Sequence, residues 1–247
     1  MVACNERGSA GPVVARRLRR EDELLAAATE VFHEHGYVGG SLQMVADRVG
    51  IRKGSIYHYI TTKEDLLYRL LMRLQSAADE ILREVACRAE LDPGGRLALY
   101  VQRLVECGVQ QLDLVSIYCN EIDCLGEERR REVHARRSAH ERFVLDLITA
   151  GQSEASAQRV VEPRVLSSCI FGAVMWTFRC HSRGATLSPE LLAEACSGFV
   201  LAGLAGCGAV GAGISIHNRP LGRLCAQTGQ PPSDRRTGLH GDERRSL

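Results

Sequence analysis

Two short helices joined by a tight turn are expected between Ser41 and Leu67 of this 247-residue chain, where the sequence is SLQMVADRVGIRKGSIYHYITTKEDLL. Ser41 stands where a helix N-cap is expected, and the apolar residues after it recur at helical spacing. Gly50 then ends the helix, because glycine readily adopts the left-handed conformation of a sharp turn. The second helix begins near Lys53 and is short, basic and aromatic. This pattern predicts a helix-turn-helix whose second helix enters the major groove of DNA.

The run from Gly54 to Leu67, GSIYHYITTKEDLL, resembles the recognition-helix signature of the TetR/AcrR family of transcriptional regulators. In that family a glycine, an aromatic pair and a Lys-acid-x-Leu run follow one another at this spacing. The stretch from Ala26 to Tyr37 also resembles the family's first helix and its exit. Ile60 stands where the family usually carries Phe, so an apolar side chain is retained for packing.

Composition favours an all-α fold, since aromatic residues are few while Leu, Ala, Arg and Glu are abundant. The periodicity and capping signals along the chain predict about nine helices. The resemblance, which is high over about residues 20–70, implies an N-terminal helix-turn-helix domain and a C-terminal helical domain for ligand binding and dimerisation. The expected division is a disordered basic arm over 1–15, the DNA-binding domain over 16–62, the ligand-binding and dimerisation domain over 63–206, and a flexible or disordered tail over 207–247.

Proline, glycine and capping residues predict where the remaining helices begin and end. Thr62 and Asp65 are spaced as a capping box, so a helix is expected from Thr62 to about Arg88. Asp92 and Pro93 separate this helix from the next. Other helices are expected near 17–35, 116–125, 126–150, 163–181 and 189–206, with Ser188 capping the last.

Positive charge is concentrated in two segments although the net charge of the chain is only +1. The first twenty residues hold five Arg and one Glu, and the segment 48–63 holds four Lys or Arg and no acid. Local positive charge favours phosphate contact, while a nearly neutral remainder limits non-specific binding. The expected macromolecular partner is double-stranded operator DNA.

Nine residues of the helix-turn-helix are candidates for DNA contact. Ser41, at a helix N-terminus, is suited to a phosphate, and the two lysines are suited to phosphates as point charges. The resemblance implies that Tyr57 and His58 touch the sugar–phosphate backbone or thymine methyl groups. Arg52, Ser55 and Gln43 are the candidates for contact with base edges. The full set is Ser41, Gln43, Arg52, Lys53, Ser55, Tyr57, His58, Tyr59 and Lys63.

Packing inside the three-helix domain competes with DNA contact for some of these residues. Ile56 and Ile60 are expected in the core because they are apolar and lie one turn apart. For Tyr57 and Tyr59 the same core packing is the alternative to DNA contact.

The resemblance further implies a homodimer whose four-helix interface is built from segments 163–181 and 189–206 of both subunits. Its apolar surface is expected to come from Leu166, Ile170, Phe171, Val174, Leu191, Leu192, Phe199 and Val200. Intramolecular core packing is the alternative for each. The uncharged segment 195–216 is long enough to cross a membrane, but six of its residues are glycine, which favours an interface helix followed by a flexible run.

A small-molecule effector in the C-terminal domain is a second implication of the resemblance. The segments 175–181 and 187–190 are similar to the C-terminal pattern of the family branch that responds to acyl-CoA thioesters, which usually carries an aromatic pair where this chain has Cys180 and His181. Arginine and histidine beside an apolar pocket suit an anionic head with an acyl tail. The candidate lining residues are Tyr100, Arg103, Leu104, Cys107, Tyr118, Glu121, Phe143, Trp176 and Arg179, with core packing as the alternative for most of them.

Ten cysteines are scattered without a CxxC pair, and the first twenty residues hold no apolar leader. We therefore expect a cytoplasmic protein whose reduced thiols act as small core residues. A thiol or metal sensor using Cys119, Cys124, His134 or Cys180 is the alternative. The chain holds no GxSxG, P-loop, HExxH or dinucleotide motif, so we expect no enzyme activity, catalytic residue, cofactor or resident metal.

Overall fold

The structure is a computed structural model that describes residues 12–154, 162–181 and 188–206. These residues form nine α-helices and one 3-10 turn, without a strand, which confirms the all-α expectation. The helices are α1 (Pro12–Gly39), α2 (Leu42–Val49), α3 (Lys53–Ile56), α4 (Lys63–Ala86), α5 (Pro93–Gln110), α6 (Leu112–Glu121), the 3-10 turn η1 (Ile122–Cys124), α7 (Glu127–Glu154), α8 (Pro163–His181) and α9 (Pro189–Gly206).

Helix α1 is longer than expected at both ends. It begins at Pro12, so the last four residues of the predicted disordered arm are helical, while residues 1–11 and the predicted tail 207–247 lie outside the described residues. Gly36 interrupts the helix with φ 67° and ψ 164°, a conformation that glycine adopts without steric cost. The chain turns there and resumes one short helical turn to Gly39.

The helix-turn-helix is built by the predicted local signals. The Ser41 hydroxyl accepts the Met44 N–H at 3.2 Å, and Gly50 closes α2 in the left-handed conformation with φ 73°. Helix α3 is shorter than expected, because regular α-helix ends at Ile56 and residues 57–59 continue as a turn. Within that turn the Tyr59 N–H donates to the Ile56 carbonyl at 3.0 Å.

The start of α4 departs from an ideal capping box. The Thr62 hydroxyl accepts the Asp65 N–H at 3.0 Å, as predicted. The Asp65 carboxylate, however, accepts the N–H of Thr61 at 3.0 Å, which is one residue before the cap. Asp65 therefore fixes the chain before the helix as well as the first turn of the helix itself.

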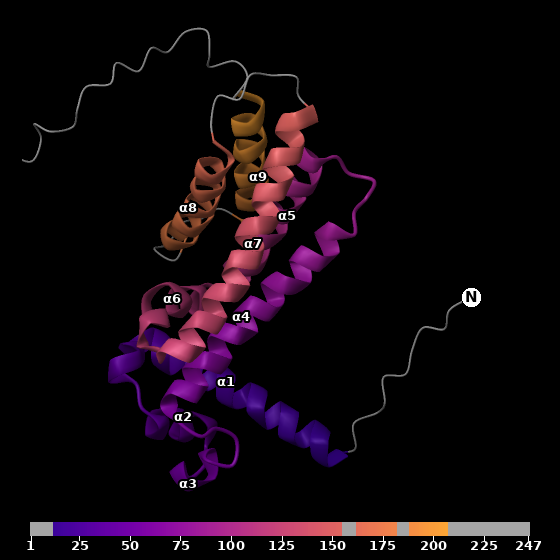
Figure 1. The fold of residues 1–247 in the computed structure, drawn as a ribbon. Coiled ribbons are helices and arrows are strands. Elements are labelled where there is room, and N and C mark those ends of the chain that lie inside the picture. The colour runs from indigo at the N-terminus through magenta and orange to yellow at the C-terminus, as the bar shows by residue number, and fades with distance from the viewer. Residues whose placement is uncertain (1–11, 155–161, 182–187, 207–247) are drawn as a thin grey trace, which may run out of the picture. The chain divides into compact units, whose positions relative to one another are not determined.

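Two apolar cores hold the described helices together. The first packs Leu24, Val31 and Phe32 of α1 against α2, α3 and the first half of α4, and it also contains Leu114 and Ile117 of α6. The second is formed by α5, α7, α8 and α9 with the end of α4 and Val115 of α6. Figure 1 shows α4 and α7 passing from one group of helices to the other. The first core thus continues beyond residue 62 and joins the helix-turn-helix to the helices that follow it.

The bounds of α8 and α9 and the N-cap of α9 agree with the prediction. Helices α8 and α9 have the expected bounds, and the Ser188 hydroxyl accepts the Leu191 N–H at 3.2 Å. Helix α6 begins at Leu112, four residues earlier than expected, and the predicted segment up to Leu125 ends in the 3-10 turn. None of the described helices is long and apolar enough to cross a membrane.

Candidate functional site

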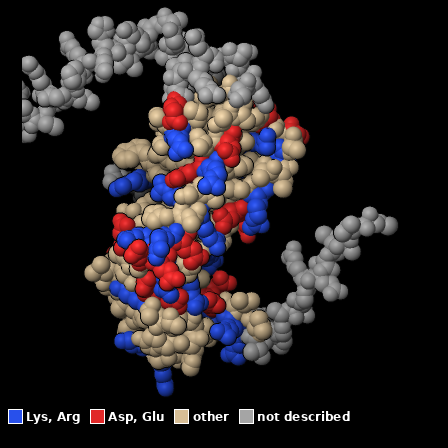
Figure 2. Space-filling view, in the orientation of Figure 1, with Lys and Arg blue, Asp and Glu red and all other residues tan. Residues whose placement is uncertain are grey.

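The surface formed by α2 and α3 exposes basic and aromatic side chains. Arg52, Lys53, Tyr57 and His58 are exposed, and Tyr57 has a relative exposure of 52%. In Figure 2 the surface over α2 and α3 shows Lys and Arg, whereas acidic side chains gather farther along the molecule. Ile56, which lies between these residues in sequence, is fully buried. The short helix therefore presents its polar residues outward while one isoleucine anchors it.

Ile60 is also buried, at 2% exposure, so the predicted core positions are confirmed. Tyr59 is half-buried and packs against the first core, as the alternative reading for that residue allowed. Ser55 is half-buried, and Ser41 keeps its hydroxyl proton available while its oxygen caps α2. The Gln43 amide donates to Asp47 at 2.7 Å along the exposed face of α2.

Lys63 is held by the end of α1 instead of extending freely. Its ammonium donates to the Val38 carbonyl at 3.2 Å and lies 4.4 Å from the centre of the Tyr37 ring. Arg48 is similarly engaged by carboxylates of α1, since it lies 2.9 Å from Glu34 and 3.2 Å from Glu30. Among the basic residues of this surface, Arg52 and Lys53 make no ion pair with a described residue.

A cavity of about 320 Å³ lies among α4, α5, α6, α7 and α8. Its walls are mainly apolar, with polar groups contributed by Gln75, His134, Arg137, His140 and Arg179. This composition is typical of small-molecule sites, where an apolar body carries a few oriented polar groups. The lining residues are Leu74, Gln75, Ala78, Tyr100, Leu104, Cys107, Gly108, Val115, Tyr118, Cys119, Ile122, His134, Arg137, His140, Phe171, Met175, Phe178 and Arg179.

Five of the nine predicted ligand-binding residues line this cavity: Tyr100, Leu104, Cys107, Tyr118 and Arg179.

The other four predicted residues do not line the cavity. Arg103 is exposed and pairs with Glu106 at 3.2 Å. Phe143 packs edge-on against Tyr100 behind the cavity wall, and Trp176 is 63% exposed on α8. Glu121 accepts the Tyr37 N–H at 3.1 Å, so it ties the end of α6 to the bend in α1.

A hydrogen-bonded chain of polar side chains forms part of the cavity wall. The Tyr100 hydroxyl lies 2.8 Å from His140 Nδ1, and His140 Nε2 lies 2.9 Å from Asp79, which also accepts from Arg136 at 3.0 Å. In the tautomer that carries its proton on Nε2, His140 donates to Asp79, and Nδ1 accepts the Tyr100 proton. Burial, followed by the nearby Asp79 charge, raises the pKa of Tyr100 far above its usual range. This chain was missed because its members come from three helices and show no local motif.

A second polar pair lies on the same cavity. The Gln75 amide donates to the Tyr118 hydroxyl at 2.9 Å, and Gln75 is buried. Burial raises the pKa of Tyr118, so its phenol proton is retained at neutral pH. That proton is then available to a ligand acceptor, which gives this wall a donor.

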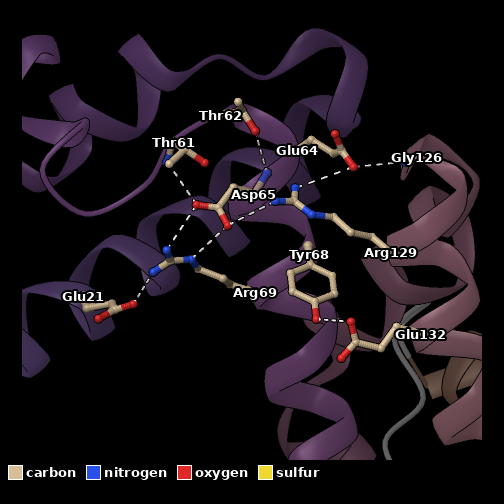
Figure 3. A network of polar contacts seen from close by, with 10 residues as sticks. All are labelled: Glu21, Thr61, Thr62, Glu64, Asp65, Tyr68, Arg69, Gly126, Arg129 and Glu132. Atoms are coloured by element: carbon tan, nitrogen blue, oxygen red, sulfur yellow. Dashed lines mark hydrogen bonds and ion pairs between the residues drawn. The ribbon is translucent and has the colours of Figure 1, made fainter.

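A network of charged side chains joins the beginning of α4 to α1 and α7, as Figure 3 shows. Asp65 accepts from Arg69 at 3.2 Å and lies 3.7 Å from Arg129, while Arg69 also pairs with Glu21 of α1. Burial raises the pKa of Asp65, but the Thr61 N–H and the two arginines outweigh it, so the net shift is downward. The carboxylate is consequently ionised at neutral pH.

Two further contacts of this network join α4 to α7 (Figure 3). The Gly126 N–H donates to Glu64 at 3.0 Å, just before α7 begins. One turn farther along, the Tyr68 hydroxyl donates to Glu132 at 2.6 Å. The same two helices line the cavity at their other sections, through Gln75 and Ala78 of α4 and the polar residues of α7.

Only some of the predicted dimer-interface residues lie on an exposed surface. Leu191 and Phe199 are exposed at 51% and 67%, whereas Ile170, Val174 and Val200 are buried in the second core of the same chain. For those three the intramolecular alternative holds. Leu166, Phe171 and Leu192 are half-buried against that core, and Phe171 also lines the cavity. Three further apolar residues are exposed on α8 and α9, namely Val165, Trp176 and Leu201.

Cysteines occupy the surface more often than expected. Cys87, Cys119, Cys169 and Cys180 are exposed, which corrects the expectation that the thiols are small core residues. Burial raises the pKa of the Cys107 and Cys124 thiols, which lowers their thiolate fraction. In the described parts of the chain, no group of three or more His, Cys, Asp or Glu side chains is arranged to hold a metal ion.

Comparison with protein-family models gives two matches along the chain. Residues 24–70 match the model of bacterial regulatory proteins of the tetR family. Residues 90–204 match the tetracyclin repressor-like C-terminal domain. The two matches follow one another in the order expected for a single regulator, and they include the helix-turn-helix and the cavity residues of α5 to α8.

Individual relatives agree with these matches. The chain is 25% identical over 191 residues to the HTH-type transcriptional repressor KstR2 of Rhodococcus jostii, covering 75% of this chain and 91% of the relative. KstR2 of Mycobacterium tuberculosis shares the fold with a TM-score of 0.69, at 23% identity and with coverage of 74% and 94%. A crystal structure of AibR with isovaleryl coenzyme A and operator DNA gives a TM-score of 0.64 at 25% identity, with coverage of 73% and 97%. The chain therefore belongs to the TetR family of transcriptional regulators, which are DNA-binding proteins and not enzymes.

Proposed function

We propose that this protein is a dimeric repressor that leaves a palindromic operator when a small effector occupies the cavity. The observation that carries the DNA-binding part is the outward face of α3 and the turn after it. Arg52, Lys53, Tyr57 and His58 are exposed there without an ion pair to a described residue, while Ile56 anchors the helix. Arg52 and Ser55 are assigned to base edges, and the lysines and Tyr57 to the backbone.

A dimer is proposed because a single helix-turn-helix, called a DNA-binding head below, makes few contacts with DNA. Trp176 on α8 and Phe199 on α9 are the most exposed large apolar side chains of those helices, and Val165, Leu191 and Leu201 are exposed on the same two helices. An exposed apolar set of this kind marks an interaction surface. Two copies joined through α8 and α9 would place two heads in major grooves about 34 Å apart or somewhat more.

Repression and release are proposed from the relatives and from the cavity. KstR2 of Rhodococcus jostii is named a transcriptional repressor, and AibR was crystallised with isovaleryl coenzyme A. The apolar cavity with Arg137 and Arg179 at its wall suits an acyl tail that is attached to an anionic head group. An acyl-CoA thioester is therefore our first candidate effector. It would act by binding a conformation with a different spacing of the two heads.

A shift assay on DNA flanking the protein's own gene, repeated with a panel of acyl-CoA thioesters, tests this function. We expect binding to one palindrome and release by at least one thioester. The variant Lys53→Ala with Tyr57→Ala should lose operator binding, while Arg131→Ala, an exposed arginine of α7, should retain it. If the Lys53/Tyr57 variant folds, dimerises and still binds the operator as tightly as the parent, the assignment of α3 to DNA is wrong.

A further inference from the structure

A second hollow, called the α7–α8 groove, adjoins the cavity and has a more polar and more charged lining. It encloses about 510 Å³ between α7 and α8. Arg137, Phe171 and Met175 line both this groove and the apolar cavity, so the two spaces share a wall. The two hollows are therefore neighbours, and a ligand that occupies both would pass beside these three side chains.

The lining residues indicate how the groove runs. On α7 they lie on one face between Arg137 and Leu145, and on α8 between Arg164 and Met175. The end shared with the cavity is the Arg137 and Met175 end. Eight residues of α7 span about 12 Å at 1.5 Å per residue, so the groove leads that far away from the cavity.

Arginine dominates the charge of the groove. Three arginines line it, Arg137, Arg142 and Arg164, against one acid, Glu141, which gives 3 − 1 = +2. Arg137 is paired with Glu141 at 2.9 Å. The side chains of Arg142 and Arg164 make no ion pair or hydrogen bond with any described residue. Two unpaired guanidinium groups at a hollow are suited to phosphate oxygens, which they bind in a bidentate manner.

We propose that the α7–α8 groove binds the phosphate-bearing part of an acyl thioester whose apolar tail occupies the cavity. This inference rests on the proposed effector class and adds the residues that recognise its head. Arg142 and Arg164 contact the phosphates, and Ser138 on the exposed part of the groove offers its hydroxyl to the polar arm between head and tail. The Ser168 hydroxyl donates to the Arg164 carbonyl at 3.0 Å, so it offers that arm an acceptor oxygen. A fatty acid without the phosphate head would use Arg137 and Arg179 at the cavity and leave the rest of the groove empty.

Calorimetry with decanoyl-CoA and with decanoic acid tests the proposal on the full-length dimer. The double variant Arg142→Gln with Arg164→Gln should raise the Kd for decanoyl-CoA about tenfold or more, since charge-assisted contacts to phosphate are lost. Its Kd for decanoic acid should change by less than about twofold. The salt dependence of decanoyl-CoA binding should also decrease, because fewer charged contacts are screened.

A matched control removes the same two charges elsewhere. Arg83→Gln with Arg131→Gln changes exposed arginines of α4 and α7 that do not line the groove, so both affinities should stay at the parent value. Equal decanoyl-CoA affinity in the Arg142/Arg164 variant and the parent would overturn the proposal. Parent protein that binds decanoic acid but not decanoyl-CoA would also overturn it, although a ligand-responsive regulator would still stand. Binding of neither probe would overturn both the groove assignment and the thioester effector, leaving operator binding unaffected.

Discussion

Replacing Asp65 with asparagine should separate the helix-turn-helix from the helices that bear the cavity. Asp65 is 7% exposed and connects three parts of the chain through Thr61, Arg69 and Arg129. Asparagine keeps the size of the side chain and one oxygen for the Thr61 N–H. It removes the negative charge, so the two guanidinium groups lose their shared partner. The substitution therefore tests the charge of the network with little change in packing.

The cost follows from the contacts that are lost. A hydrogen bond to a charged group contributes about 1.5–3 kcal/mol. The Arg69 and Arg129 side chains are 33% and 31% exposed, so water partly replaces the carboxylate and each loss is discounted to roughly 1 kcal/mol. Loss of an anion in the first turn of α4 adds about 0.3–1 kcal/mol. We expect Asp65→Asn to lower the free energy of unfolding by about 2–3 kcal/mol, or Tm by roughly 4–12 °C.

The effect should depend on pH in a defined direction. The pKa of Asp65 is lowered in the folded protein, because the Thr61 N–H and the arginines outweigh the effect of burial. The unfolded chain then binds more protons than the folded chain between the two pKa values, so stability rises with pH there. The contribution of Asp65 is complete above the unfolded value of about 4 and is lost as pH falls through the lower, folded value. The difference between parent and variant should be constant from pH 7 to about pH 5 and shrink below about pH 4.

Thermal unfolding followed by far-UV circular dichroism, at one fixed protein concentration, measures this difference. Glu127→Gln is the control, because Glu127 is 76% exposed and its pair with Arg131 is 3.8 Å long. An exposed pair of this kind contributes about 0.2–1 kcal/mol, so the control should stay close to the parent. If Asp65→Asn is as stable as Glu127→Gln at pH 7, or if its deficit persists unchanged below pH 4, the role assigned to the Asp65 charge is refuted.

Three other substitutions test other parts of the molecule. Lys53→Ala should weaken binding to all DNA sequences alike and reduce the slope of log affinity against log salt by about one, as measured by titration at several salt concentrations; an unchanged slope would remove Lys53 from the phosphate contacts. Gly108→Ala should place a methyl group against the buried Phe178 ring, lower the free energy of unfolding by about 1–3 kcal/mol and weaken decanoyl-CoA binding; calorimetry with unaltered affinity would show that the ring does not bound the site. Trp176→Glu should convert the proposed dimer to monomers in sedimentation velocity with helix content retained, and a dimer that persists would place the interface elsewhere.

The helix-turn-helix could be predicted in detail because its signals are local. Ser41, Gly50 and Thr62 act within three or four residues of their own positions, so capping chemistry is visible in the sequence itself. The predicted burial of Ile56 and Ile60 followed from the same short-range periodicity. The early end of α3 was missed because residues 57–59 keep helix-like hydrogen bonds without continuing a regular α-helix.

The cavity could be predicted only in part, because its wall is assembled from distant segments. Residues 127–137 are a charged run that indicates a solvated helix face, yet His134 and Arg137 line the cavity. Which face of α7 meets α4 and α5 depends on tertiary packing that no local pattern records. Trp176 illustrates the opposite error: a large aromatic residue suggests an interior position, but Ile170, Val174 and Phe178 supply the buried face of α8.

Helices α4 and α7 connect the cavity to the helix-turn-helix. Helix α4 carries Asp65 at the junction and Asp79 beside the cavity, about 21 Å apart at 1.5 Å per residue. Asp79 bonds to His140 of α7, and at the other end Glu64 of α4 bonds to the Gly126 N–H that precedes α7. A ligand that displaces α7 from α4 at His140 must therefore stretch the Glu64 contact or move α4 with it. Helix α4 shares the first core with the helix-turn-helix. Movement of α4 therefore changes the position of the helix-turn-helix and the spacing between the two DNA-binding heads of the proposed dimer.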